Sequence, residues 1–222
     1  MGVLLMLMTM GGLIVAGILF VAALVTKLRW LVKLTIGGVA VWLVFYFVML
    51  LGFSLTSTER VLAENESKEY CGFYFDCHIH TIVTSVSTAQ NIGDRRANGT
   101  FYIVGIRVFS DAKNPGIALH LIDPSATIVM PDGNKLDRDT AAESNLPSGN
   151  VKFDVDIRSS QTIDKEIAFD VVDPSADLKL LITEGCGIDK TIENLLVGDE
   201  DSFLHAPTLF ALKPRGETTR VR

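Results

Sequence analysis

Two long apolar runs open the chain. Val3 to Val25 contains no charged residue, and Leu31 to Phe53 contains one, Lys33, near its start. Each run is 23 residues long, which as a helix reaches about 34 Å at 1.5 Å per residue. That length crosses a hydrocarbon core of about 30 Å, and neither run has the polar face of a buried hairpin in a soluble protein. The pattern predicts a transmembrane helical hairpin over residues 1–53, with spans 3–25 and 31–53.

The alternative for the first run is a cleavable signal peptide, which carries a basic start and a shorter apolar core. No basic residue precedes Lys27, and the second run follows after only five residues. Lys27, Arg29 and Lys33 gather at the turn, and short basic loops stay in the cytoplasm. We therefore expect an inner (cytoplasmic) bacterial membrane protein with both termini on the periplasmic side.

The residues inside the spans bear on function. Apart from Lys33 neither span holds Asp, Glu, His, Lys or Arg, which argues against a transporter, a proton relay or a voltage sensor. Small residues recur at Gly12 and Ala16 in the first span and at Gly37 and Gly38 in the second, where they allow close helix approach. Two alternatives follow: the two helices pack on each other there, or they pack against helices of a partner protein.

Beyond the spans the pattern changes. Residues 54–70 are polar and predict a linker, with one or two helical turns near its start. From Tyr70 short alternating runs bounded by Gly, Pro, Asn and Asp predict strands. The expected strands are Ile79–Val86, Thr100–Phe109, Ala126–Met130, Val151–Ile157, Ile167–Val172, Leu178–Thr183 and Thr208–Leu212. Asp132-Gly133 is a hairpin signal. The fold class expected is membrane-anchored all-β: an antiparallel immunoglobulin-like β-sandwich over 71–213, then a tail, 214–222.

Residues 100–185 resemble the immunoglobulin-like (telokin-like) domain of secreted bacterial proteins and lipoproteins of unknown function. The resemblance is carried by Thr100–Phe109, by Ala126–Gly133, and by Ala168–Pro174 before Leu178–Leu180. It implies the fold and an extracytoplasmic compartment, and it supplies no catalytic residues. Members of that family are usually lipid-anchored after a signal peptide, whereas this chain has two apolar runs.

Charge limits the partners. The whole chain has 20 basic and 26 acidic residues, and the three basic residues of the hairpin leave 17 against 26 in the remainder. This acidic balance argues against nucleic acid as a partner. It favours either a basic soluble protein at the acidic outer domain or plain solubility.

The densest chemical cluster begins at the first two of the three cysteines, Cys71, Cys77 and Cys186. In an oxidising compartment we expect a disulfide between Cys71 and Cys77. His78 and His80 share one face of a strand, and with Cys77 or Asp76 they suggest a copper or zinc site. The alternative is a disulfide flanked by two half-exposed histidines, which removes the thiolate ligand. The role of Cys186 stays open.

Other candidate chemistry is sparse. No nucleophile motif, phosphate loop or dinucleotide fingerprint occurs, so no enzyme and no cofactor other than copper or zinc is expected. Two acidic segments, Glu193–Asp201 and Asp132–Asp139, suggest calcium binding, docking of a basic protein, or solvated loops.

Three functions follow from these observations. The leading hypothesis is a non-enzymatic accessory subunit of a larger membrane complex, respiratory or photosynthetic for example. Its helices would contact integral membrane subunits and lipid, and its β-sandwich would cover their outer face. The alternatives are a membrane-anchored copper, zinc or redox protein using Cys71, Cys77, His78 and His80, and a free-standing ligand-binding or adhesion module.

Overall fold

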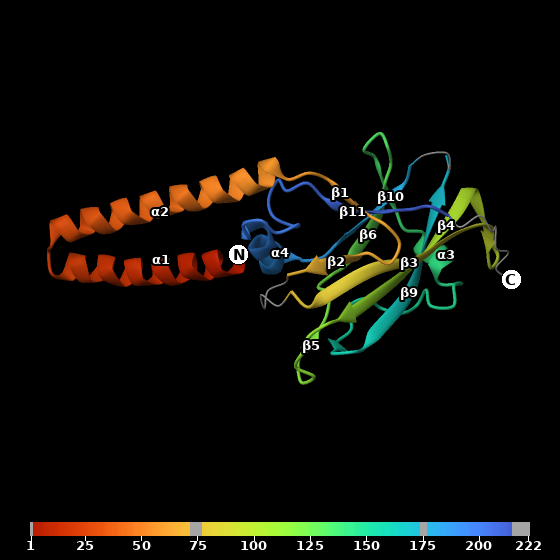
Figure 1. Cartoon of the computed structure of the whole chain (residues 1–222), viewed down its shortest axis with the longest axis horizontal. Coiled ribbons are helices and arrows are strands. Elements are labelled where there is room, and N and C mark those ends of the chain that lie inside the picture. The colour runs from red at the N-terminus through yellow and green to blue at the C-terminus, as the bar shows by residue number, and fades with distance from the viewer. Residues whose placement is uncertain (1, 72–76, 174–176, 215–222) are drawn as a thin grey trace. The chain divides into compact units, whose positions relative to one another are not determined.

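A computed structural model describes residues 2–71, 77–173 and 177–214 (Figure 1). The chain divides into two compact units, each described by itself below. The first comprises Met1–Thr58 together with Thr191–Ala206, and the second comprises Glu59–Lys190 together with Pro207–Arg222. Most of the tail expected at 214–222 and the loop between Cys71 and Cys77 lie outside the described residues.

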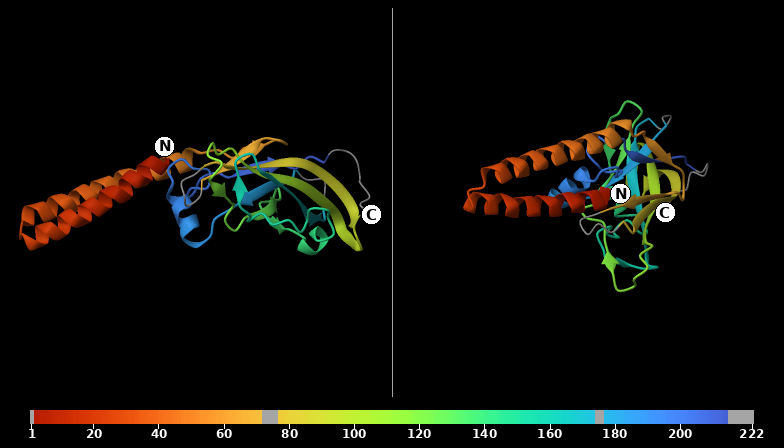
Figure 2. Two further views of the ribbon diagram at one scale, coloured as in Figure 1. Left: turned by 90° about the horizontal axis from the view of Figure 1, so that it is seen from below. Right: turned by 60° about the vertical axis from the view of Figure 1, so that its left-hand side comes forward.

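The first unit is built on two long helices, α1 (Gly2–Val25) and α2 (Arg29–Thr56). They run antiparallel beside each other, joined by a tight turn (Figures 1 and 2). In this turn Lys27 takes a left-handed backbone conformation, with φ of 58°. Both helices are long and apolar enough to cross a membrane. The expected apolar hairpin is therefore present, and its helices extend slightly beyond the predicted spans.

Contacts between α1 and α2 occur at both ends of the pair. Ala23 is fully buried beside the turn. Toward the other end, the indole Nε1 of Trp42 donates a 3.0 Å hydrogen bond to Oγ1 of Thr9, which is itself buried. The Thr9 hydroxyl in turn donates to the carbonyl oxygen of Leu5, at 2.8 Å.

The remainder of the first unit is the segment 191–206, which packs on the end of the hairpin opposite the turn. Val197 forms a buried cluster with Tyr46 and Leu50 of α2, and Leu5 of α1 packs against this cluster. Ser57 Oγ, just after α2, accepts a 2.7 Å hydrogen bond from the backbone N–H of Ala206. The acidic stretch in this segment is therefore not the solvated loop that its composition suggested.

The described residues of the second unit form three sheets. The four-stranded sheet is antiparallel, in the order β2 (Ser67–Tyr70), β3 (Ile79–Ile92), β4 (Arg95–Ser110) and β9 (Thr162–Val171). The five-stranded sheet has the order β1 (Arg60–Leu62), β11 (Thr208–Ala211), β10 (Lys179–Thr183), β6 (Ser125–Val129) and β7 (Lys135–Asp137). Its β1–β11 pair is parallel, and its other pairs are antiparallel. The third sheet pairs β5 (Ala118–Leu119) with β8 (Ile157–Arg158).

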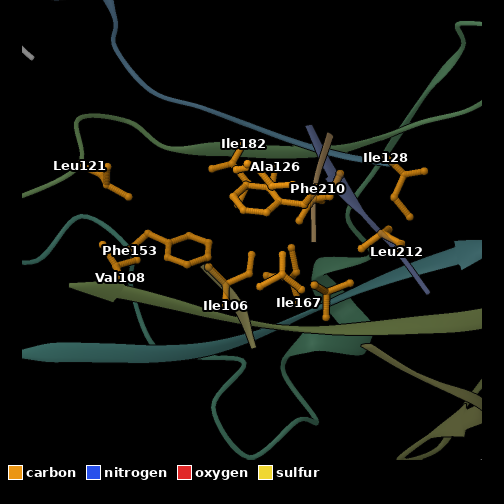
Figure 3. Close-up of a cluster of buried hydrophobic side chains, with 14 of the residues drawn as sticks. Ile106, Val108, Leu121, Ala126, Ile128, Phe153, Ile167, Ile182, Phe210 and Leu212 are labelled. Carbon is orange, nitrogen blue, oxygen red and sulfur yellow. The ribbon is translucent and has the colours of Figure 1, made fainter. Parts of the chain in front are cut away.

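One buried cluster draws on both larger sheets (Figure 3). Ile106 and Ile167 come from the four-stranded sheet, whereas Ile128 and Phe210 come from the five-stranded sheet. Strand β4 is buried on both faces along its middle, from Phe101 to Ile106. Its second face packs on a smaller cluster that includes residues from α3 (Thr140–Glu143) and from the turn after it.

The β3–β4 hairpin is the longest element of the four-stranded sheet and curves along its length (Figure 2). Its pairing register shifts twice, between Val83 and Ser85 and between Ala89 and Asn91. Such irregularities bend a strand and increase its twist.

Six of the predicted strands are confirmed, as β3, β4, β6, β9, β10 and β11. The predicted strand Val151–Ile157 is wrong, because only Ile157–Arg158 is extended and paired. Residues 54–70 also differ from the predicted linker and helical turns: α2 continues to Thr56, and β1 and β2 follow. The reason is long-range pairing, since β1 lies beside β11 from the far end of the chain. A helix, α4 (Gly187–Leu195), begins before the acidic segment Glu193–Asp201 and was not predicted.

Candidate functional site

A group of ionisable side chains lies on one face of the four-stranded sheet, near the start of β3. Glu69 on β2 is paired with His80 on β3, and His80 is paired with Phe109 on β4. One step further along the hairpin, the backbone N–H of Asp111 donates a 3.2 Å hydrogen bond to the carbonyl oxygen of His78. Side chains two residues apart on a strand share a face. The backbone therefore places His78, His80, Asp111 and Glu69 on the same face.

The two imidazoles converge on one carboxylate oxygen. Nδ1 of His78 lies 2.7 Å from Oδ1 of Asp111, and Nε2 of His80 lies 3.2 Å from the same atom. The side chain of His80 is 13 % exposed, against 46 % for His78 and 56 % for Asp111. Its ring stacks on that of Phe109, with centroids 5.1 Å apart. We name His78, His80 and Asp111 the imidazole–carboxylate cluster.

The cluster changes the chemistry of its carboxylate. The hydrogen bond with His78 holds the pKa of Asp111 below its usual value, and His80 adds a smaller effect in the same direction against the opposing effect of burial. Neither ring nitrogen of His80 makes a hydrogen bond of good geometry, and both are inaccessible to solvent. The cluster thus combines an anionic oxygen with buried nitrogen atoms whose hydrogen-bonding capacity is unused.

The cysteines next to this cluster are oxidised. Cys71 and Cys77 form the expected disulfide, so Cys77 has no thiolate to offer a metal ion. Glu69, Cys71 and Cys77 bring three potential ligand atoms within 4.8 Å of one another, but two of these atoms are the bonded sulfurs. Asp76 lies outside the described residues. Cys186 is a free, exposed thiol.

The small residues of the hairpin do not bring α1 and α2 together. An atom placed at the Cβ position of Gly12, Gly37 or Gly38 meets none of the described residues within 4 Å. Gly12, Ala16 and Gly38 instead line an apolar crevice of about 480 Å³ between the helices. A second apolar crevice, of about 420 Å³, is lined by Ala16, Gly17 and Ala40 among others. The helices therefore leave space beside their smallest residues.

A polar cavity of about 430 Å³ lies in the second unit, lined by residues of 123–124, 138–144, 149–154 and Lys165. Lys165 is buried, and its Nζ donates to the carbonyl oxygens of Gly149 and, at 2.7 Å, of Val151. Glu143 is also buried, and its Oε1 accepts a 3.3 Å hydrogen bond from the backbone N–H of Ala168. The same oxygen lies 3.6 Å from Nε of Arg138.

Burial dominates the ionisation of this pair. It raises the pKa of Glu143, against the opposing effects of Arg138 and of the Ala168 hydrogen bond. Burial likewise lowers the pKa of Lys165, against the favourable effect of Glu143. Sequence patterns do not reveal this group, because only the fold brings Glu143 of α3 and Lys165 of β9 to the same cavity. Lys165, Glu143 and Arg138 are all bonded to other groups of the protein. We therefore interpret these three residues as a structural group, named the buried brace, which holds residues 149–151 in place.

Two residues of the acidic segment 132–139 serve local structure. Asp139, within the predicted acidic stretch 132–139, caps α3 by accepting a 2.9 Å hydrogen bond from the backbone N–H of Ala142. It also pairs with Arg95 at 2.7 Å. Asp132 accepts from the backbone N–H and the side-chain amide of Asn134, at 3.0 and 2.6 Å. Caps and turns of this kind use carboxylates without a metal ion.

No protein-family model matches the sequence, and no curated protein or solved structure matches it.

Proposed function

We propose that this chain is a non-enzymatic accessory subunit of a larger membrane protein complex. In this proposal α1 and α2 cross the inner membrane of a bacterium and contact helices of integral membrane subunits. The second unit lies in the periplasm as an immunoglobulin-like β-sandwich that covers the outer face of the complex, where its acidic surface would suit a basic protein. Both termini are periplasmic in this arrangement.

The chemistry of the helices supports insertion. Only 11 % of the residues in the most apolar window of each helix are buried, unlike the core helix of a soluble protein. Two polar groups in the middle of the helices are bonded within the pair: Trp42 donates to Thr9, and Thr35 Oγ1 donates to the carbonyl oxygen of Leu31 at 2.9 Å. Internal satisfaction of polar groups is the condition for stability in hydrocarbon.

The observation that carries the proposal is the unfilled space beside the glycines. Small residues in membrane helices allow another backbone to approach closely. Here Gly12 and Gly38 line an apolar crevice and contact none of the described residues through their Cβ positions. A hairpin that served only as an anchor would gain nothing from these residues. Helices of a partner protein, packed against this face, would use them.

Two features support a periplasmic location for the second unit. The Cys71–Cys77 disulfide is typical of proteins outside the reducing cytoplasm. Lys27 lies in the turn between α1 and α2, and Arg29 is the first residue of α2. The positive-inside rule assigns such a basic turn to the cytoplasm.

The test is affinity purification of the full chain in a mild detergent, with identification of the integral membrane proteins that accompany it. Gly12→Leu and Gly38→Leu fill the crevice from within. If each disrupts close helix packing, recovery of the partner should fall by about tenfold or more, the change expected for a loss of about 1.4 kcal/mol.

Matched control variants add bulk elsewhere on the same helices. Ile14 and Val41 are 65 % and 72 % exposed and line neither crevice. Ile14→Phe and Val41→Phe should leave partner recovery unchanged. Recovery of the wild-type chain alone as a monomer, or equal losses in all four variants, would contradict the proposal and favour a free-standing module.

A further inference from the structure

We propose that the polar cavity of the second unit binds a small zwitterionic ligand, a molecule with one carboxylate and one amino group such as a free amino acid. The cavity has a volume of about 430 Å³. Small-molecule sites have volumes of about 300–1,000 Å³, so this cavity suits a compact ligand. The proposal does not depend on the accessory role, because an accessory subunit can also bind a small molecule.

The lining of the cavity carries charges of both signs in equal number. It contains three basic and three acidic residues: Arg138, Lys152, Lys165, Asp123, Glu143 and Asp154. A ligand with a single charge would meet like charges in this lining, whereas a zwitterion finds partners of both signs. Such complementarity determines which ligand a polar site selects.

Arg138 is the residue best suited to hold the carboxylate. Its guanidinium group has five N–H donors in a planar fork that matches a carboxylate. Within the part of the chain that the structure describes, this group makes one ion pair, with 3.6 Å between its Nε and Oε1 of Glu143, and no hydrogen bond. The side chain is 25 % exposed. Its terminal nitrogen atoms are therefore available to a ligand in the cavity.

The charges of Arg138 and Lys165 repel each other. Burial lowers the pKa of Lys165, Glu143 opposes this effect, and Arg138 adds to the lowering. The ammonium group of Lys165 is held in place by its hydrogen bonds to the carbonyl oxygens of Gly149 and Val151. A ligand carboxylate bound at Arg138 would offset this repulsion, so both cations favour an anionic group in the cavity.

The segment 152–154 supplies a second pair of charges, and all three of its residues line the cavity. Phe153 is buried in the core cluster (Figure 3), which fixes the segment between its two exposed neighbours, Lys152 and Asp154. Among the described residues neither neighbour has a hydrogen-bond or ion-pair partner. Lys152 can therefore add to the binding of the carboxylate, and Asp154 and Asp123 can accept from the amino group.

The experiment uses the full chain in detergent, dialysed to remove co-purified small molecules and titrated by calorimetry with each standard amino acid in turn. At least one of them should bind, with one molecule per chain and a Kd below about 1 mM. That amino acid should also raise the Tm of the protein. If none of them binds, the proposal is overturned.

Derivatives of the amino acid that binds most tightly test the two charges separately. Its carboxamide lacks the negative charge, and its N-acetyl derivative lacks the positive charge. Each should bind about tenfold more weakly or worse, because each loses a charge-assisted hydrogen bond. Undiminished binding of either derivative would overturn the assignment of a zwitterion.

Variants of the lining test the location of the ligand. Arg138→Gln removes the main partner of the carboxylate and should weaken binding by about tenfold or more. Lys152→Gln and Asp154→Asn change exposed side chains, so they keep the test valid even if Arg138→Gln disturbs the buried brace. Each should weaken binding by about threefold, the size of effect that an exposed charge pair gives.

The chain supplies matched controls in β7, just before Arg138. Lys135→Gln and Asp137→Asn make the same chemical changes at exposed residues that do not line the cavity. Both variants should bind the amino acid as tightly as the wild type does. Equal losses in the lining variants and the controls, or no loss in any lining variant, would overturn the proposal.

Discussion

The phenolic hydroxyl of Tyr46 donates a 2.5 Å hydrogen bond to the carbonyl oxygen of Leu195, 149 residues further along the chain. Leu195 is the last residue of α4, and the final carbonyl groups of a helix have no partner within it. Tyr46 therefore satisfies a helix end and joins the 191–206 segment to α2.

Removing this hydroxyl tests the attachment. Tyr46→Phe should weaken the packing of the 191–206 segment by about 1–2 kcal/mol, because the part-buried carbonyl group of Leu195 loses its partner. Limited proteolysis in detergent micelles should then cut this segment faster than in the wild type. Val48→Ala, at a residue 62 % exposed on the same helix, is the control and should leave the rate unchanged. Equal rates in all three proteins would contradict this role for Tyr46.

The buried brace makes a second prediction. Lys165→Met keeps the aliphatic length but leaves the carbonyl groups of Gly149 and Val151 without their donor. We expect the free energy of unfolding to fall by about 1–3 kcal/mol. This is the cost of leaving the buried carbonyl group of Gly149 and the part-buried one of Val151 without a donor, less the cost of burying an ammonium group. Denaturant unfolding of the full chain measures it. Lys152→Met, at an exposed lysine close by, should change stability little, and equal losses in both variants would count against the brace.

Glu143 gives a pH prediction. Its folded-state pKa is raised, chiefly by burial. The folded chain thus holds this proton more tightly than the unfolded chain does. The resulting stability is fully present below the unfolded pKa, about 4.5, and is lost as pH rises through the folded pKa. Glu143→Gln has no carboxyl group to ionise and does not lose this stability. The Tm of the variant minus that of the wild type should therefore increase as pH rises above about 4.5. A constant Tm difference across that range would refute the assignment.

The disulfide determines how many cysteine thiols should be reactive. Of the three cysteines, only Cys186 is free and exposed. Unreduced protein should therefore react with one equivalent of maleimide, and reduced, unfolded protein with three. Loss of the Cys71–Cys77 bond should lower stability by about 2 kcal/mol, since it closes a short loop. Cys71→Ser/Cys77→Ser measures this effect, and three reactive thiols in the unreduced protein would show that the bond does not form.

The sequence predicted those elements whose signal is local. Uninterrupted apolar runs predict α1 and α2, and alternation with β-branched residues predicts β3, β4 and β9. The apparent strand Val151–Ile157 alternates equally well but is not one. Lys165, from β9, bonds the carbonyl oxygens of Gly149 and Val151, and Phe153 enters the core. An alternating segment can thus pair with a neighbouring strand, or it can bond a side chain and bury one apolar residue without such pairing. The alternation of apolar and polar residues is the same in both cases.

The candidate site also has one part that sequence could predict and one part that it could not. His78 and His80 share a face because of strand periodicity, which sequence reveals. Asp111 could not be assigned, because its position depends on register. Counted from the end pair of the hairpin, Ile92 with Arg95, unbroken pairing would place Phe109 opposite His78. The two register shifts in β3–β4 move Asp111 there instead, and such shifts have no reliable sequence signal.

The discontinuity of the first unit has a consequence for biogenesis. The hairpin is synthesised first, yet the residues that cover Tyr46 and Leu50 belong to the segment 191–206. At about 5–20 residues per second, translation delays their arrival by on the order of ten seconds. During that interval the end of the newly made hairpin is uncovered, and a prematurely terminated chain would remain so. The end of the hairpin is thus covered only after residues 191–206 have been made. In an unfinished chain Leu50 would remain exposed, as a feature that the cell's quality control could recognise.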